Sequence, residues 1–133
     1  MSCYCGRGDK YETCCKPFHM GEKIAGSPEE LMRSRYSAFC VKNIPYLINT
    51  TDPQARGHLE EVSYKEWAEM AVFKKLDLIS YDDLGNKGHV EFKAYYEIEN
   101  KEQLHHEYSK FRKQAGVWYY REGKDLTPPA REE

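Results

Sequence analysis

The sequence has no long hydrophobic run and no excess of charge of one sign. Its apolar stretches are far shorter than the roughly 18 residues expected of a membrane span. The first residues lack the basic start, apolar run and small-residue cleavage site of a signal peptide. Lys and Arg number 20 against 22 Asp and Glu, a formal charge of −2, which disfavours nucleic-acid binding. We expect a cytoplasmic protein without membrane contact.

Cysteine is scarce over most of the chain but concentrated at its start. Four of the five cysteines fall within the first 15 residues: Cys3, Cys5, Cys14 and Cys15. In a reducing compartment, such clusters are more typical of metal ligands than of disulfides. Four thiolates from two turns can close a tetrahedron around Zn²⁺. The spacing predicts one structural zinc ion, with His19 as an alternative to Cys15 for the fourth ligand.

Disulfides or free thiols are the alternative interpretation of the cluster. Cys14 and Cys15 are adjacent, and a bridge between neighbouring residues is strained because it departs from relaxed disulfide geometry. The isolated Cys40 is expected to be an ordinary small buried side chain.

The length of 133 residues allows one domain and a small appendage. Ser27-Pro28-Glu29-Glu30 is a capping box that predicts a helix from residue 28. A short helix is expected over residues 45–50. Ser63-Tyr64-Lys65-Glu66 is a second capping box and predicts the start of another helix.

Beyond residue 73 the hydrophobic period changes from that of a helix to that of a strand. Residues 90–98 alternate apolar and polar, and residues 76–81 precede them as another strand. Asn100-Lys101 and Ala115-Gly116 are predicted hairpin turns. Helices followed by strands indicate an α+β fold, with the helices packed on a curved four-stranded antiparallel sheet.

A buried charge is predicted between the helices and the sheet. Arg35 lies inside an apolar helix stripe, and strand alternation turns Glu107 to the side of Phe111. Because an unpaired interior charge is costly, we predict that Arg35 pairs with Glu107, assisted by Tyr36 or Ser109. The candidate cavity residues are Arg35, Tyr36, Glu107, Ser109, Trp118 and Tyr120.

A structural ion pair is the favoured interpretation of this charge, ahead of a catalytic carboxylate with His105 or His106 beside it. The sequence contains no nucleophile motif, phosphate-binding glycine loop or metalloprotease signature. No catalytic residue is therefore assigned. The sequence leaves open whether the protein is an enzyme, and it favours one that is not.

Residues 3–15 resemble the SEC-C zinc motif, which is best known at the C-terminus of the SecA motor. Residues 31–39, 106–111 and 118–123 look like the bacterial YchJ-like family, and the resemblance covers essentially the whole chain. It implies a zinc knuckle joined to a nuclear-transport-factor-2-like (NTF2-like, cystatin-like) cone, with no established activity. The expected boundaries are 1–26 for the SEC-C-type zinc knuckle, 27–126 for the NTF2-like domain and 127–133 for a flexible tail.

The leading functional hypothesis is a zinc-binding protein whose knuckle is a structural or protein-docking module with a protein partner. The alternative is a small-ligand binder or enzyme that uses the cone cavity of the α+β domain. A nucleic-acid binder is the weaker alternative.

Overall fold

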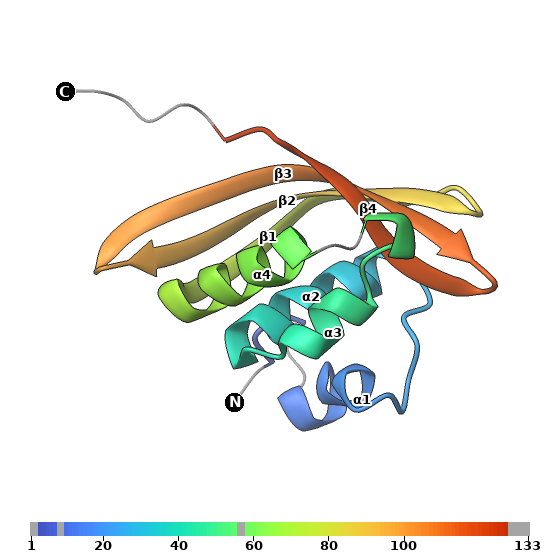
Figure 1. Cartoon of the computed structure of the whole chain (residues 1–133), viewed down its shortest axis with the longest axis horizontal. Coiled ribbons are helices and arrows are strands. Elements are labelled where there is room, and N and C mark those ends of the chain that lie inside the picture. The colour runs from blue at the N-terminus through green and yellow to red at the C-terminus, as the bar shows by residue number, and fades with distance from the viewer. Residues whose placement is uncertain (1–2, 8–9, 56–57, 128–133) are drawn as a thin grey trace.

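The computed structural model describes residues 3–7, 10–55 and 58–127. Helices cover one face of a curved antiparallel sheet (Figure 1), so the predicted α+β fold is confirmed. The helices are α1 (Lys16–His19), α2 (Pro28–Val41), α3 (Ile44–Asn49) and α4 (His58–Met70). Two short 3₁₀ turns lie at Tyr11–Thr13 and Pro53–Ala55. The strands are β1 (Val72–Asp83), β2 (Lys87–Ile98), β3 (Lys101–Gln114) and β4 (Val117–Asp125).

Helix α2 begins where its capping box predicts. The Ser27 side chain accepts a hydrogen bond from the Glu30 backbone N–H at 3.1 Å, and Pro28 occupies the first turn. The helix ends at Val41, and the cap residue Lys42 has a φ of 61°, in the left-handed region that closes many helices. The start of α2 is therefore defined by local sequence.

The second capping box does not start a helix, so that prediction is wrong. Helix α4 begins at His58, and Ser63 lies inside it. Residues three apart on any helix are neighbours one turn away. A Ser-x-x-Glu pattern therefore also occurs within helices, where it caps nothing.

The strands form a simple meander in the order β1-β2-β3-β4, all antiparallel. The turn between β2 and β3 is Glu99-Asn100, one residue before the predicted pair, and both residues have positive φ (53° and 65°). Ala115 and Gly116 repeat this geometry (50° and 80°). Two positive φ values suit the right-handed twist of a two-residue hairpin.

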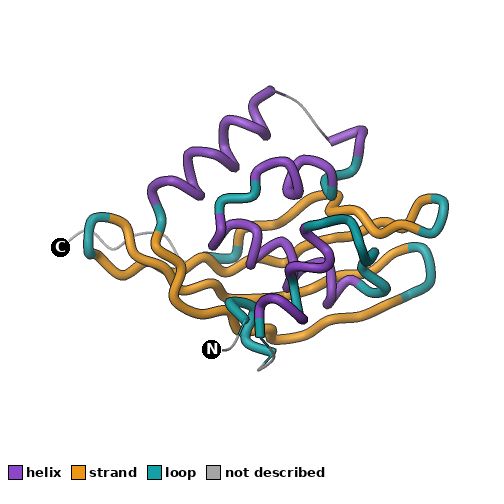
Figure 2. The backbone as a smooth tube through the Cα atoms, turned by 90° about the horizontal axis from the view of Figure 1, so that it is seen from below, coloured by secondary structure: helices purple, strands orange, loops and turns teal. Residues whose placement is uncertain are grey.

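The core lies between the helices and the concave face of the sheet, which Figure 2 shows from the helix side. From α2, Leu31 and Met32 pack with Phe92, Phe111 and Trp118 of the sheet. A smaller cluster joins the helices to one another through Ala38, Phe39, Leu47, Tyr64 and Ala68. This arrangement places α2 in contact with both layers.

Among the described residues, no helix is both long and apolar enough to cross a bilayer.

Thr127 is held to β3 because its hydroxyl accepts a hydrogen bond from the His106 N–H at 2.8 Å. The rest of the predicted flexible tail, 128–133, lies outside the described residues.

The two Ser-x-x-Glu sequences make a matched pair for testing the cap. Ser27→Ala should lower the free energy of unfolding by about 1 kcal/mol, because it removes an N-cap acceptor. Ser63→Ala should change it by less than about 0.5 kcal/mol, since Ser63 is exposed inside α4. Urea unfolding measures both values. An equal loss in the two variants would show that α4 starts at Ser63.

Candidate functional site

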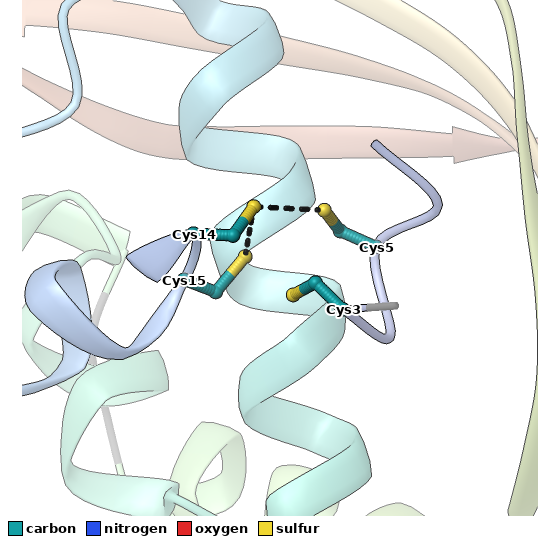
Figure 3. A group of neighbouring side chains, drawn as sticks. All are labelled: Cys3, Cys5, Cys14 and Cys15. Carbon is teal, nitrogen blue, oxygen red and sulfur yellow. Dashed lines mark hydrogen bonds between the residues drawn. The ribbon is translucent and has the colours of Figure 1, made fainter. Parts of the chain in front are cut away.

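Four cysteine side chains from two separate segments meet beside α2 (Figure 3). Their ligand atoms all lie within 4.8 Å of one another, and all four residues are buried. Cys14 Sγ is 3.6 Å from Cys5 Sγ and 3.9 Å from Cys15 Sγ. All are free thiols. The fold therefore gathers the predicted cluster into one candidate metal site.

The spacing of the sulfur atoms fits tetrahedral coordination. Zn–S bonds of about 2.3 Å place the sulfurs of a regular tetrahedron about 3.8 Å apart, and Cys14 Sγ lies 3.6 and 3.9 Å from its two neighbours in the cluster. Hydrogen bonding, chiefly with Cys15, lowers the pKa of Cys5 to about 5, whereas burial raises that of Cys14 to about 12. Because the four thiols lie close together, one of them can lose its proton readily. Deprotonation of all four needs a cation among them.

The two ring nitrogens of His19 contact groups outside the cysteine cluster. Its Nε2 donates to the Ser34 carbonyl at 2.8 Å, which leaves Nδ1 of the neutral ring to accept from the Tyr11 hydroxyl at 2.8 Å. Burial also lowers the pKa of His19, which favours this neutral form. Both ring nitrogens are thus engaged, and the geometry favours Cys15 over His19 as the fourth member of the cluster.

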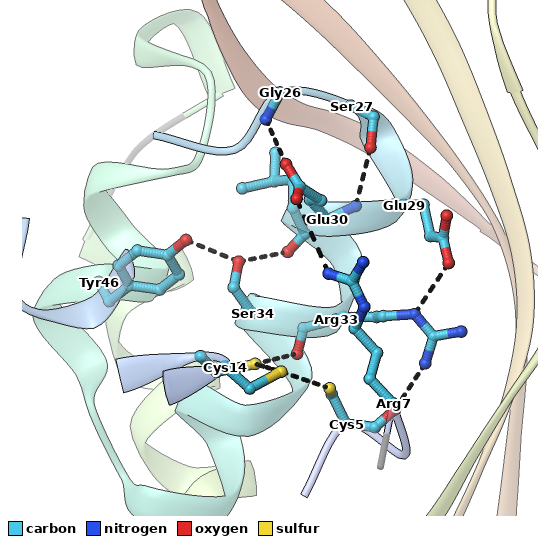
Figure 4. Close-up of polar contacts among 12 residues, drawn as sticks. Cys5, Arg7, Cys14, Gly26, Ser27, Glu29, Glu30, Arg33, Ser34 and Tyr46 are labelled. Carbon is cyan, nitrogen blue, oxygen red and sulfur yellow. Dashed lines mark hydrogen bonds and ion pairs between the residues drawn. The ribbon is translucent and has the colours of Figure 1, made fainter. Parts of the chain in front are cut away.

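Hydrogen bonds and an ion pair join the cysteine segment to α2 (Figure 4). Arg33 donates from Nη1 to the Cys5 carbonyl at 2.7 Å and from Nε to Glu29 at 3.0 Å. Cys3 Sγ lies 3.5 Å from the Ser37 hydroxyl. Arg7 forms a longer ion pair with Glu30, at 3.7 Å. Most of these α2 partners lie on one side of the helix.

Arg35 is buried, with 3% of its surface exposed, as the helix stripe predicts. Its guanidinium donates to the Leu47 carbonyl at 2.9 Å, to Thr50 Oγ1 at 2.7 Å and to Tyr64 Oη at 3.0 Å. The ring of Tyr120 packs on it, with a centroid 4.6 Å from Cζ. Arg35 therefore ties α2 to α3, α4 and β4 at once.

The predicted ion pair between Arg35 and Glu107 is wrong. Glu107 accepts hydrogen bonds from Ser109, from the Tyr120 hydroxyl at 3.0 Å, and from His105 Nε2 at 2.8 Å. In the described part of the chain, no carboxylate lies within ion-pair distance of Arg35. Tyr120 contacts both groups and separates them, with its ring against Arg35 and its hydroxyl on Glu107.

A cavity of about 80 Å³ opens between α2, α4 and the sheet. Of the predicted cavity residues, Arg35, Tyr36, Glu107 and Tyr120 line it. Ser109 and Trp118 are buried nearby without lining it. The prediction missed several aromatic members of the wall, which are Phe39, Tyr64, Trp67, Phe73 and Phe92. Tyr64 and Trp67, three apart in α4, were detectable as one helix face.

Glycine at position 123 makes room for the Glu107 carboxylate. A Cβ built there would overlap both the Glu107 carboxylate and the Tyr120 hydroxyl. Ser109 pairs with Gly123 across β3 and β4, which brings the bare backbone to this point. The hydrogen-bonded cluster therefore depends on the absence of a side chain.

Comparison with known proteins gives a consistent family. Residues 27–123 match the family described as YchJ, middle NTF2-like domain. A UPF0225 protein of Geobacter sulfurreducens is 36% identical over 95% of this chain and 80% of its own length. One from Haemophilus influenzae is 39% identical, over 89% of this chain and 74% of its own.

Two solved structures share the fold over nearly the whole chain. A SEC-C motif containing protein from Rhodopseudomonas palustris has a TM-score of 0.88 at 40% identity, covering 96% of this chain and 100% of its own. Another, from Psychrobacter arcticus, has a TM-score of 0.81 at 28% identity, covering 98% and 85%.

Glu107 should make stability depend on acid pH. Burial alone would raise its pKa, but the hydrogen bonds from His105, Ser109 and Tyr120 outweigh it, so the pKa lies below its usual 4.5. A carboxyl group whose pKa is lowered in the folded state stabilises the fold above pH 4.5. That contribution is lost as the pH falls through the lowered pKa. Thermal unfolding from pH 7 to 3 should show a steeper loss in the wild type than in Glu107→Gln. Parallel curves would contradict this role.

Proposed function

Because the chain belongs to the YchJ family, with an NTF2-like domain over residues 27–123, we propose that its four N-terminal cysteines bind one structural Zn²⁺. The observation that carries the proposal is the sulfur geometry: four buried thiols lie within 4.8 Å of one another, and two of their separations, 3.6 and 3.9 Å, are near a tetrahedral edge. The SEC-C description of two structural relatives supports the same ligand set.

A structural rather than a catalytic role follows from the donor set. Four thiolates complete a tetrahedron and leave no open position for water or substrate. Cys5 is fully buried and Cys15 is 2% exposed, so solvent has little access to the sulfurs. When bound, the ion crosslinks the chain around Cys3 and Cys5 to Cys14 and Cys15.

The metal site would also support the larger domain. Arg33 holds the Cys5 carbonyl, and the Cys15 thiol approaches the Arg33 carbonyl at 3.8 Å. The described knuckle residues therefore pack on the same helix that forms one wall of the NTF2-like core. Closing the knuckle around a metal should stabilise α2 in its place.

Protein docking by the knuckle stays a prediction, as does a cytoplasmic location. Three large apolar side chains from the knuckle segment are exposed: Tyr4 at 49%, Met20 at 63% and Ile24 at 67%. Aromatic side chains and Met are enriched where proteins contact one another. These residues are the first to substitute in a search for a partner.

Metal stoichiometry tests the cluster directly. Elemental analysis of protein purified under reducing conditions should give about one zinc per chain, as expected for a closed four-thiolate site. Cys5→Ser should lose most of the metal, whereas Cys40→Ser should keep it, because Cys40 is not a member of the cluster. Wild-type protein without bound zinc would contradict the proposal.

The fourth ligand can be identified by a second pair of variants. Cys15→Ser should weaken zinc binding strongly, by well over ten-fold, because a thiolate ligand is lost. His19→Ala should retain the metal, since both ring nitrogens of His19 contact other groups. Competition with a chromogenic chelator gives both affinities. The reverse order would assign the site to His19.

Removing the metal should also destabilise the α+β domain. Both tryptophans, Trp67 and Trp118, lie in this domain, so their fluorescence reports its unfolding separately from the knuckle. We expect chelation to lower the thermal midpoint of wild-type protein, because a ligand of the native state alone stabilises it. The shift should be smaller in Arg33→Met, which lacks the bond to Cys5. An unchanged wild-type midpoint would show that the knuckle and domain are independent.

A further inference from the structure

The cavity between α2, α4 and the sheet has an aromatic body and a polar end. Phe39, Trp67, Phe73 and Phe92 line its apolar part. The volume is about 80 Å³. A water-sized group needs roughly 10–15 Å³ of such space, so about five to eight non-hydrogen atoms fit. The space suits a small organic molecule rather than a peptide or cofactor.

Arg35 supplies a cation at this cavity with part of its hydrogen-bonding capacity unused. A guanidinium has five N–H donors. Nη1 uses its two hydrogens on Leu47, Thr50 and Thr51, and Nη2 uses one on Tyr64. Within the described residues, the Nε–H and the second Nη2 hydrogen have no acceptor.

Those two unused donors define the chemistry of a complementary group. The Nε and Nη2 atoms form one edge of the planar guanidinium, the geometry that a carboxylate matches. A buried cation is also costly without an opposite charge, and no described carboxylate is within ion-pair distance of Arg35. A ligand carboxylate would supply both the charge and the acceptors.

His105 places a hydrogen-bond acceptor on the cavity wall. Its Nε2 is 2.8 Å from Glu107 Oε1. An ionised carboxylate only accepts, so Nε2 carries a hydrogen, and in the neutral form of the ring Nδ1 is then an acceptor. In the described part of the chain, Nδ1 has no hydrogen-bond partner. A ligand hydroxyl can donate to this atom.

We propose that the cavity binds a short hydroxycarboxylate, with its carboxylate on the Nε and Nη2 donors of Arg35, its hydroxyl on His105 and its carbon chain between the aromatic rings. Glu107 holds the His105 tautomer, and its carboxylate also accepts a hydrogen bond from the Tyr120 hydroxyl. Binding of this kind is a function of the α+β domain alone.

The proposal does not rest on the metal site. The cavity is lined by Met32, Arg35, Tyr36 and Phe39 of α2, whereas the cysteine segment contacts Arg33, Ser34 and Ser37. At 100° per residue these two sets lie on opposite sides of the helix. Ligand binding and metal binding can therefore fail separately.

Nuclear magnetic resonance titration of the full chain, as purified under reducing conditions, tests the site with three probes of similar size: 3-hydroxybutyrate, butyrate and butyramide. We expect 3-hydroxybutyrate to bind most tightly, with amide shifts clustered at cavity residues such as Met32, Phe92 and His105. Butyramide should bind at least about ten-fold more weakly than butyrate, because losing a charged hydrogen-bonded group costs more than about 1.4 kcal/mol. His105→Phe should abolish the preference for 3-hydroxybutyrate over butyrate.

Two variants separate binding from folding. Ala94→Val reduces the cavity, because Ala94 lies in its wall, and should weaken 3-hydroxybutyrate binding several-fold while the spectrum stays well dispersed. Arg35→Lys keeps the charge without the planar edge and should also bind more weakly. Lys93→Met, the matched control, removes a cation from the neighbouring position on β2 and should bind as the wild type does.

Several results would overturn the proposal. They are an absence of shifts with 3-hydroxybutyrate, shifts confined to the outer face of the sheet, equal binding of butyrate and butyramide, or unchanged binding by folded Ala94→Val. Equal binding of butyrate and 3-hydroxybutyrate would overturn the role given to His105. If Arg35→Lys does not fold, the butyramide comparison and Ala94→Val decide the outcome.

Discussion

The buried guanidinium of Arg35 is the interaction on which the helix layer depends. Short helices such as α3, Ile44–Asn49, have little apolar surface with which to fix their position. Arg35 compensates by donating to the Leu47 carbonyl and Thr50 at the end of α3 and to Tyr64 in α4. One side chain of α2 thus sets the position of two neighbouring helices, at the cost of burying a charge.

Helix α2 also joins the two candidate sites. One side receives the cysteine segment through Arg33 and Ser37, and the other forms the cavity wall through Arg35 and Phe39. A displacement of α2 would therefore change both sites. The cysteine segment contacts one side of this helix, and the cavity lies on its other side.

Local sequence signals predicted the ends of elements well where the stabilising contact is made by a residue close by in the sequence. The Ser27 cap and the Ala115-Gly116 turn are confirmed because their hydrogen bonds or φ values involve only adjacent residues. The Ser63 box failed because its spacing has the same period as any helical turn. The burial of Arg35 was predictable from periodicity, which defines a face but not the residue opposite that face.

The register of β4 illustrates what periodicity leaves out. The strand pairing shifts between Lys110 and Phe111. Strict alternation would continue the inward face of Trp118 and Tyr120 to residue 122, but the shift places Gly123 opposite Ser109 instead. Room for the Glu107 carboxylate follows from that irregularity.

The sequence by itself determined the cysteine cluster, the order of helices and strands, and the presence of a charge in the core, because spacing and period follow from the covalent chain. Only the tertiary structure decided that His19 has other partners, that Tyr120 separates Arg35 from Glu107, and that aromatic rings of α2, α4 and the sheet enclose a cavity. Those outcomes depend on contacts between residues far apart in the chain, and local pattern carries no information about such distances.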